Sequence, residues 1–221
     1  MTQLHYNYFH CGPFLFHTKA TPDECKLFEK ASYRCRKKEL DNRTKLAGHL
    51  KEEYNLQPEA NNLAPILKKY FELYVQGYNQ WRGQGGMKPN FQLTHLWVNF
   101  MKQYEFNPPH DHGGDLSFIF YPHMPEEIIK ECAAHIGTMR GPGGVAWFYG
   151  EGGHSCINTV TQMPSTGDFY IFPAELKHWV FPFKSDVVRL SISGNVVLEE
   201  DSRFSYFGPT EKTVDCLKKD L

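Results

Sequence analysis

The sequence lacks a surplus of charge of either sign. Lys and Arg number 24 against 25 Asp and Glu, which gives a formal net charge of −1. A chain without a basic surplus is not expected to bind nucleic acid or to be attracted to an anionic membrane surface. We therefore expect its partners to be small molecules or another protein.

The sequence also lacks any Cys-x-x-Cys pair and any long apolar run. Its 6 cysteines are scattered, which argues against a zinc ribbon and against a dense disulfide framework. No stretch is long enough to span a bilayer, and the first residues, MTQLHYNYFHCGPF, contain no basic segment followed by an apolar one. These absences predict a soluble protein of a reducing compartment, the cytoplasm.

Aromatic residues, at 15%, are abundant, which suits a packed core rich in strands. A length of 221 residues fits a single domain. Within it we expect a mainly helical support region (1–91), a catalytic β core (92–197) and a polar C-terminal tail (198–221).

The N-terminal region contains two helical patterns. TPDECKLFEKASYRCRKKEL begins with the pattern of a capping box, formed by Thr21 and Glu24, and its apolar residues then recur at helical spacing. A second helix is predicted to begin near Pro65, because apolar residues over 63–78 fall on one stripe. The stretch between them, HLKEEYNLQPEANN, is predicted to be a polar connection.

From about Gln92 the apolar pattern alternates, as it does in strands. The predicted strands lie in QLTHLWVNFMKQYEF, DLSFIFY, GGVAWFYG, GDFYIFP, HWVFPF and DVVRLSISGNVV, and PEEIIKECAAH is predicted to be a short helix among them. Several short strands at this spacing favour a sandwich or barrel over alternating βαβ units.

Two histidines stand one residue apart in NPPHDHGGDLSFIF. On a strand, residues i and i+2 point to the same side, so His110 and His112 could present both imidazoles to one point while Asp111 faces away. His178, in FPAELKHWVFPF, lies at the start of another predicted strand. Each could bind a metal ion, although a histidine taken alone is more often structural or exposed.

Arg189 and Ser191 share one face of the predicted strand in VVRLSIS, shortly after His178. A buried strand rarely places an arginine on its inward face without an anion to receive it, and a guanidinium beside a hydroxyl suits a carboxylate. The alternative is an outward Arg189, in water or paired with Asp186. The alternation alone does not say which face is inside.

In their order and spacing these motifs resemble the iron(II)- and 2-oxoglutarate-dependent dioxygenases, specifically the prolyl-4-hydroxylase-like group found in bacteriophages and bacteria. The resemblance covers roughly residues 95–197 and includes LWVNF, LSFIFY, GDFYIFPAELKHWVFPF and RLSISGN. It implies an α+β, mainly β fold with a double-stranded β-helix (jelly-roll, cupin-like) core and N-terminal helices packed on one sheet. If a phage encodes the chain, the compartment would be the host cytoplasm.

The resemblance also implies a reaction and the residues that perform it. A C–H bond of a peptidyl (prolyl) or amino-acid substrate would be hydroxylated while 2-oxoglutarate and O2 are converted to succinate and CO2, with ascorbate as an optional cofactor. Tyr121 would share in co-substrate binding, although a core aromatic is an equally good interpretation of it. The implied catalytic Fe(II) ligands are His110, His112 and His178, and the implied 2-oxoglutarate-binding residues are Arg189, Ser191 and Tyr121.

Position 112 departs from the pattern of the wider superfamily, whose triad consists of two histidines and a carboxylate. Here the second ligand position holds His112, so Asp115, three residues further on in a glycine-rich turn, is the alternative ligand. Strand alternation favours His112.

Two other functions remain open from the residues alone. A three-histidine, cupin-type metal dioxygenase or isomerase that does not use 2-oxoglutarate would explain the missing carboxylate, but it would leave Arg189 without a purpose. A non-catalytic phage β-barrel binding protein, with incidental histidines or a structural metal, would also be compatible with the near-neutral charge and the many aromatic residues.

Overall fold

The computed structural model describes residues 12–82, 90–138, 141–152 and 158–198. Apart from Leu198, the predicted C-terminal tail therefore lies outside the described residues. None of the helices in these ranges is both long and apolar enough to cross a membrane. The helices are α1 (Pro22–Lys37), α2 (Ala60–Arg82) and α3 (Glu126–Ala133), with short 3₁₀ turns η1 (Arg43–Lys45) and η2 (Gln57–Glu59). The strands are β1 (Phe16–Lys19), β2 (Glu53–Asn55), β3 (Phe91–Met101), β4 (Asn107–His110), β5 (Leu116–His123), β6 (Val145–Phe148), β7 (Thr159–Gln162), β8 (Asp168–Pro173), β9 (Lys177–Val180) and β10 (Arg189–Leu198).

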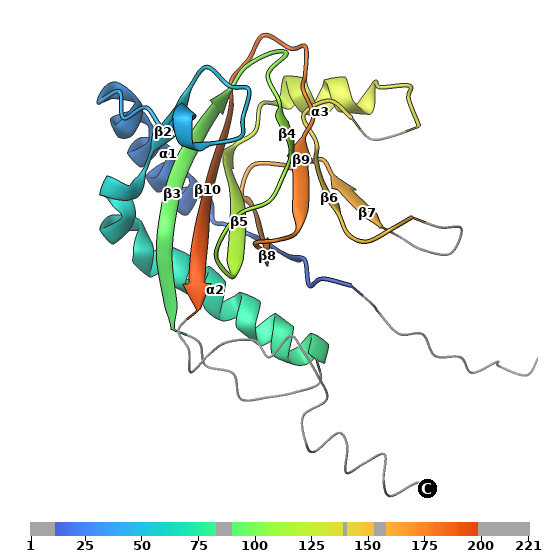
Figure 1. Ribbon diagram of the computed structural model, residues 1–221. Helices are drawn as coiled ribbons and strands as arrows, with labels where there is room; N and C mark the ends of the chain where they lie inside the picture. The colour runs from blue at the N-terminus through green and yellow to red at the C-terminus, as the bar shows by residue number, and fades with distance from the viewer. Residues whose placement is uncertain (1–11, 83–89, 139–140, 153–157, 199–221) are drawn as a thin grey trace, which may run out of the picture.

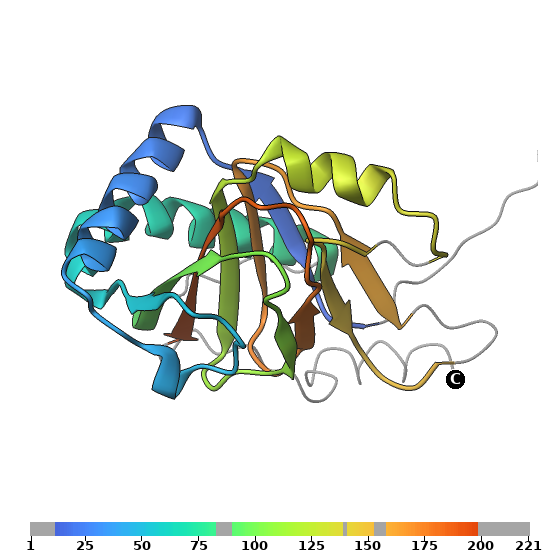
Figure 2. The same cartoon turned by 90° about the horizontal axis from the view of Figure 1, so that it is seen from above.

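The strands form two antiparallel sheets, so the fold is mixed and mainly β (Figure 1). The larger sheet has the order β1-β8-β5-β10-β3-β2, and the smaller one has the order β4-β9-β6-β7. Helices α1 and α2 lie on one side of the larger sheet, and the smaller sheet lies on the other, as the view from above shows (Figure 2). Strands β1 and β2, from the region predicted to be mainly helical, complete the larger sheet at its two edges.

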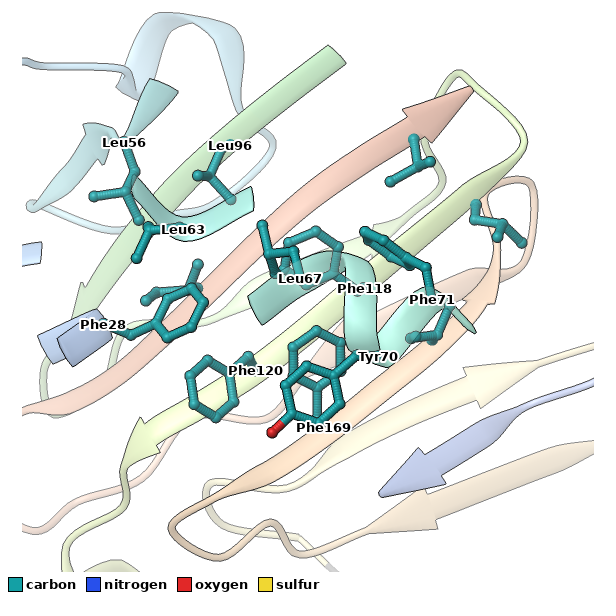
Figure 3. Packing of buried hydrophobic residues seen from close by; sticks show 14 of the residues in the cluster. Phe28, Leu56, Leu63, Leu67, Tyr70, Phe71, Leu96, Phe118, Phe120 and Phe169 are labelled. Carbon is teal, nitrogen blue, oxygen red and sulfur yellow. The ribbon is translucent and has the colours of Figure 1, made fainter. Parts of the chain in front are cut away.

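A first apolar cluster fills the space between the helices and the larger sheet (Figure 3). Phe28 of α1 meets Phe120 edge-on with ring centroids 5.0 Å apart, and Phe71 of α2 meets Phe118 in the same way at 5.7 Å. Edge-to-face contacts of this kind add to the stabilisation from apolar burial. Both helices are thereby fixed against β5, near the centre of the sheet.

A second apolar cluster lies between the two sheets and includes Met101 of β3, Tyr121 of β5, Trp147 of β6 and Val180 of β9. Because side chains alternate along a strand, the two clusters use opposite faces of the larger sheet. Along β10, the even-numbered residues from Leu190 to Val196 that carry apolar side chains belong to the helix-side cluster. The odd-numbered residues, which begin with Arg189, therefore face the smaller sheet.

Helix α1 confirms the predicted capping box. The Thr21 hydroxyl accepts a hydrogen bond from the backbone N–H of Glu24 at 3.3 Å, and the Glu24 carboxylate accepts one from the N–H of Thr21 at 2.9 Å. The same carboxylate accepts a hydrogen bond from the hydroxyl of Tyr70 in α2 at 2.6 Å. The N-terminal cap of one helix thus also links the two helices.

Helix α2 begins at Ala60, so the predicted start near Pro65 is wrong by about one turn and a half. Pro65 lies inside the helix, where its missing N–H removes one hydrogen bond from an early turn. The buried Leu63 and Leu67 flank it and hold this part of the helix against the sheet. Packing of the apolar stripe therefore outweighs the local effect of the proline.

The stretch predicted to be a polar connection contains strand β2, so that prediction was incomplete. Strand β2 pairs with β3, with Glu53 opposite Asn99 and Asn55 opposite Trp97. Three residues are too short a run to show an alternating pattern. Strands β1 and β7, of four residues each, were also not predicted. The pairing of β2 brings Glu53 to the interior, where it is 1% exposed.

Gly194 offers a test of how tightly the centre of the larger sheet is packed. A Cβ atom at this position would lie 2.6 Å from Cε1 of Phe118 and 2.7 Å from the carbonyl oxygen of His95, which belongs to the paired strand β3. We expect Gly194→Ala to lower the free energy of unfolding by about 1–3 kcal/mol, measured by urea denaturation. Gly113→Ala is the control, because no atom lies within 4 Å of its Cβ position. Equal stability of the two variants would contradict this account of the packing.

Candidate metal centre

Three histidines meet between the two sheets. His110 ends β4 and lies opposite His178 of β9 in the strand register, with ring centroids 4.3 Å apart. The ring of His112 lies 4.9 Å from that of His110 and 5.0 Å from that of His178. One nitrogen from each ring lies within 4.8 Å of the other two. This spacing would let the three imidazoles share one metal ion.

The backbone places the two neighbouring histidines differently from the prediction. Strand β4 ends at His110, so His112 does not share a strand with it. The chain instead continues without regular structure, and the N–H of His112 donates to the carbonyl of Ala174 at 2.9 Å. Both rings still reach the same point, and Asp111 between them is exposed.

Two of the three rings are held by hydrogen bonds to backbone carbonyls. Nδ1 of His110 lies 2.7 Å from the carbonyl oxygen of Pro108, and Nδ1 of His178 lies 3.0 Å from that of Leu176. A carbonyl oxygen only accepts hydrogen bonds, so each Nδ1 carries the hydrogen and each Nε2 keeps a free lone pair. Metal-binding histidines are commonly oriented by such a bond on the nitrogen that does not bind the metal.

Burial keeps all three histidines neutral at physiological pH. Burial, together with the repulsion of neighbouring imidazoles, lowers the pKa of His178 to about 3 and that of His112 to about 4. The pKa of His110 is lowered by burial as well. Neutral imidazole is the form that can donate a lone pair to a metal ion.

Asp115, the alternative ligand, lies apart from this cluster. Its carboxylate accepts a hydrogen bond from the backbone N–H of Leu198 at 2.7 Å, and its own N–H donates to the carbonyl of Val196. Both contacts tie Asp115 to the end of β10. Within the described residues, the cluster consists of three imidazoles and contains no carboxylate.

Arg189 is buried, with 1% of its surface exposed. Its Nη1 donates to the carbonyl of Gly143 at 3.2 Å, whereas its Nε has no hydrogen-bond partner. No described carboxylate forms an ion pair with it, so both alternatives, an outward side chain and a pair with Asp186, are wrong. Burial without an anion lowers the pKa of Arg189 and makes its charge costly.

Tyr121 and Ser191 lie on the strands beside this guanidinium. The guanidinium carbon of Arg189 lies 5.6 Å from the ring centroid of Tyr121, whose hydroxyl is buried without a partner. Burial raises the pKa of Tyr121 to about 12, so the hydroxyl keeps its hydrogen and can donate it. Ser191 is also buried. The interior thus holds the positive charge of Arg189 without a negatively charged partner among the described residues, and a Tyr121 hydroxyl without an acceptor.

A cavity of about 30 Å³ adjoins the three histidines, Tyr121 and Ser191. Its other lining residues include Glu53, Asn99 and Asn107, which the sequence did not single out. Each has one side-chain oxygen that is buried without a partner, namely Oε2 of Glu53 and Oδ1 of each asparagine. Alternation within LWVNF could have placed Asn99 on the inner face, but no sequence pattern indicated Glu53.

A larger cavity of about 380 Å³ opens beside His112 and shares Trp97 and Leu46 with the small one. The ring centroid of Trp97 lies 5.4 Å from that of His112. Polar side chains, including those of Asn55 and Asp111, form much of the lining of this outer cavity. It offers space for a reactant directly next to the histidine cluster.

Comparison with known proteins relates the part of the chain that holds this site to a family of enzymes. Residues 95–195, which contain every predicted site residue, match the model of a family described as "Putative 2OG-Fe(II) oxygenase", where 2OG is 2-oxoglutarate. No curated protein matches the chain. The match confirms the resemblance over these residues and indicates that the protein is an enzyme, a 2-oxoglutarate- and iron(II)-dependent oxygenase.

Solved structures share the fold. A prolyl-4-hydroxylase of Pseudomonas putida is 16% identical with a TM-score of 0.50, and the alignment covers 83% of this chain and 91% of that one. A viral collagen prolyl hydroxylase of Paramecium bursaria Chlorella virus-1, in complex with 2-oxoglutarate, is 12% identical with a TM-score of 0.54, covering 84% and 96%. An oxidoreductase of the 2OG-Fe(II) oxygenase family from Burkholderia pseudomallei is 10% identical with a TM-score of 0.51, covering 83% and 84%.

The buried carboxyl group of Glu53 should give the protein a distinct pH dependence. Burial, followed by repulsion from Glu105, raises its pKa from 4.5 to about 7. Between these values the folded protein binds more protons than the unfolded chain, so stability falls as the pH rises through this window. From about pH 4 to about pH 8, we expect wild type to lose roughly 2–3 kcal/mol of unfolding free energy relative to Glu53→Gln.

Urea denaturation of both proteins, free of metal, measures this difference. The three histidines are present in both proteins, so their own titration cancels in the comparison. A difference between wild type and Glu53→Gln that stays constant with pH would show that Glu53 titrates normally.

Proposed function

We propose that the protein is a non-haem Fe(II)- and 2-oxoglutarate-dependent hydroxylase of a peptidyl or amino-acid substrate, related in activity to the prolyl hydroxylases. The observation that carries the proposal is that three neutral imidazoles converge on one point. Tyr121, which lines the same cavity, lies next to a buried arginine that has no acidic partner among the described residues. We further propose that the two sheets form a double-stranded β-helix, as the resemblance implies.

His110, His112 and His178 would hold the iron through their nitrogen atoms. Imidazole is a good ligand for Fe(II), and the hydrogen bonds on Nδ1 of two of the rings leave their Nε2 atoms available. Three imidazoles carry no negative charge, in contrast to a triad with a carboxylate. We therefore expect the iron to be held more firmly once the anionic co-substrate is present.

Arg189 would bind the distal carboxylate of 2-oxoglutarate. A guanidinium can form two parallel hydrogen bonds with a carboxylate, and its unpartnered Nε is free to take part. The protonated hydroxyl of Tyr121 and the hydroxyl of Ser191 would donate to the same group. A molecule of 2-oxoglutarate is larger than the 30 Å³ cavity, so its binding requires the side chains around the cavity to move apart.

When bound, iron and 2-oxoglutarate supply the oxidative chemistry, in which one atom of O2 enters succinate, the other enters the hydroxylated product, and CO2 is released. The chain's own residues bind, orient and exclude water. Phe172 packs against His178 with ring centroids 4.9 Å apart, and Trp147 lies opposite His178 in the register of β6 and β9. These buried aromatic side chains pack around His178 and shield it from water.

A three-histidine oxygenase or isomerase that does not use 2-oxoglutarate is the second candidate. It would account for the absence of a carboxylate in the cluster, but it gives the buried charge of Arg189 no anion to bind. Arg189 therefore favours the 2-oxoglutarate-dependent reaction. The free thiols of Cys25, Cys35 and Cys132 support a reducing compartment, and we propose the cytoplasm.

Co-substrate binding can be followed by absorption spectroscopy. Anaerobic addition of Fe(II) and 2-oxoglutarate to wild type is expected to give a weak visible charge-transfer band. Arg189→Ala should weaken 2-oxoglutarate binding by on the order of 100-fold or more, because a buried charge pair is lost. Ile192→Val, a small change on the opposite face of β10 in the cluster under the helices, is the control for folding and should keep the band. A folded wild-type protein that gives no band would refute the proposed function.

The identity of the second metal ligand can be decided by measuring bound iron. We expect His112→Ala to lose the iron that wild type retains in the presence of 2-oxoglutarate, because only two imidazoles remain. Asp115→Ala should keep the iron, since this carboxylate is engaged by the backbone of Leu198. Iron retained in His112→Ala but lost in Asp115→Ala would overturn the assignment.

A further inference from the structure

We propose that Glu53, Asn99 and Asn107 form a subsite for the substrate that is hydroxylated, and that this subsite takes a cationic nitrogen bearing N–H groups, such as an ammonium or guanidinium. The proposal rests on the proposed function, because it places the nitrogen of the substrate beside the proposed iron ligands. The main evidence for it is that these three residues, each with a buried side-chain oxygen that has no hydrogen-bond partner, line the same cavity as the three histidines.

The three oxygens are costly to bury without a partner. Glu53 is 1% exposed and Asn99 is 3% exposed, and a buried acceptor without a hydrogen bond costs about 1–3 kcal/mol. The oxygens come from three different strands, β2, β3 and β4, yet they line one cavity. When the Glu53 carboxyl is ionised, all three oxygens are acceptors, so the partner that satisfies them must donate hydrogen bonds.

The charge around Glu53 favours a cationic donor over a neutral one. Its sequence neighbour Glu52 binds Arg36 at 2.6 Å and also pairs with Lys102. No ion pair involves Glu53 within the described part of the chain. The carboxylate of Glu105, which raises the pKa of Glu53 by repulsion, adds negative charge to this region. A buried carboxylate without a counterion is best stabilised by a cation.

The strand order places this subsite and the group that would bind the co-substrate carboxylate toward opposite ends of one cavity. Glu53 lies opposite Asn99, and Asn99 lies opposite Ser191, so the three form a row across β2, β3 and β10. Arg189 and Tyr121 belong to β10 and β5, at the other end of this part of the sheet. A carboxylate is attracted to the end that holds the arginine, and a cationic nitrogen is attracted to the end that holds the glutamate.

Gly48 keeps space open at the subsite. A Cβ atom at this position would lie 2.5 Å from Oδ1 of Asn107 and 2.5 Å from Oε1 of Glu53. Both atoms are at the ends of side chains, so an alanine would push the two oxygens aside without necessarily disturbing the backbone. Gly48→Ala is therefore a second way to disrupt the subsite while its carboxylate remains.

This chemistry narrows the substrate class. A prolyl residue inside a peptide has no N–H, so its own nitrogen cannot satisfy these oxygens. Free amino acids, including free proline, carry a cationic nitrogen with N–H groups, and so do lysyl and arginyl side chains. The subsite thus favours an amine-bearing substrate over a peptidyl proline.

Matched probes test the proposal by calorimetric titration of anaerobic protein loaded with Fe(II) and 2-oxoglutarate, at about pH 8, where the Glu53 carboxyl is ionised. One arm compares free L-proline and L-lysine with their Nα-acetylated forms. A second arm compares terminally blocked tripeptides that have lysine, arginine, norleucine or proline at the centre. In at least one arm we expect the probe with the cationic nitrogen to bind at least about tenfold more tightly than its neutral counterpart. The arm that shows this preference tells whether the α-nitrogen or a side-chain nitrogen is recognised.

The preference should disappear in Glu53→Gln, weaken in Gly48→Ala and persist in Glu52→Gln, which removes a neighbouring carboxylate that already has its own cations. The proposal is overturned if neither arm shows a cationic preference, if the blocked prolyl tripeptide binds best, or if Glu53→Gln keeps the preference. The charge-transfer band of each sample distinguishes a failure of the subsite from a failure of the proposed function. A band without a cationic preference refutes only the subsite, whereas a folded wild-type protein without a band refutes the proposed function itself.

Discussion

The alternation of side chains along β10 is the constraint on which the rest of the structure depends. Leu190 and Ile192 belong to the cluster under the helices, so Arg189 and Ser191 are turned to the space between the sheets. A shift of one residue in the register would exchange these faces and bury the arginine among the phenylalanines. The helices therefore do more than cover the sheet: their packing fixes which side of β10 faces the histidines.

A polar interior of this kind works against stability and has to be supported by its surroundings. Arg189, Glu53 and His178 are buried, and His110 and His112 are half-buried. Arg189 and the ionised form of Glu53 carry charges without ion-pair partners among the described residues. The apolar cluster between the sheets and the one under the helices offset this cost. Ligands of the opposite charge would remove part of it, so binding of metal and co-substrate is coupled to folding stability.

Sequence reasoning identified the parts of this protein that carry local signals. The capping box of α1 and the meeting of the three histidines were indicated by short motifs. Strand alternation put Arg189 and Ser191 on one face of β10 but left open which face points inward, and the structure shows that Arg189 is buried. Strand β2 could not be predicted, because a three-residue strand has no period and is defined by its pairing with β3, more than 40 residues away. Glu53 was missed for the same reason. The early start of α2 was missed because tertiary packing of Leu63 outweighs the signal of Pro65.

The two prolines of β4 have a consequence for how the metal would bind. Pro108 and Pro109 fix their own φ angles, and the carbonyl of Pro108 also holds the ring of His110. A chain segment with so few accessible conformations has little entropy left to lose when its histidine becomes a ligand. The segment 108–110 is therefore conformationally restricted before a metal ion binds. Most of the structural adjustment on binding is expected at His112, which lies on irregular backbone two residues further on.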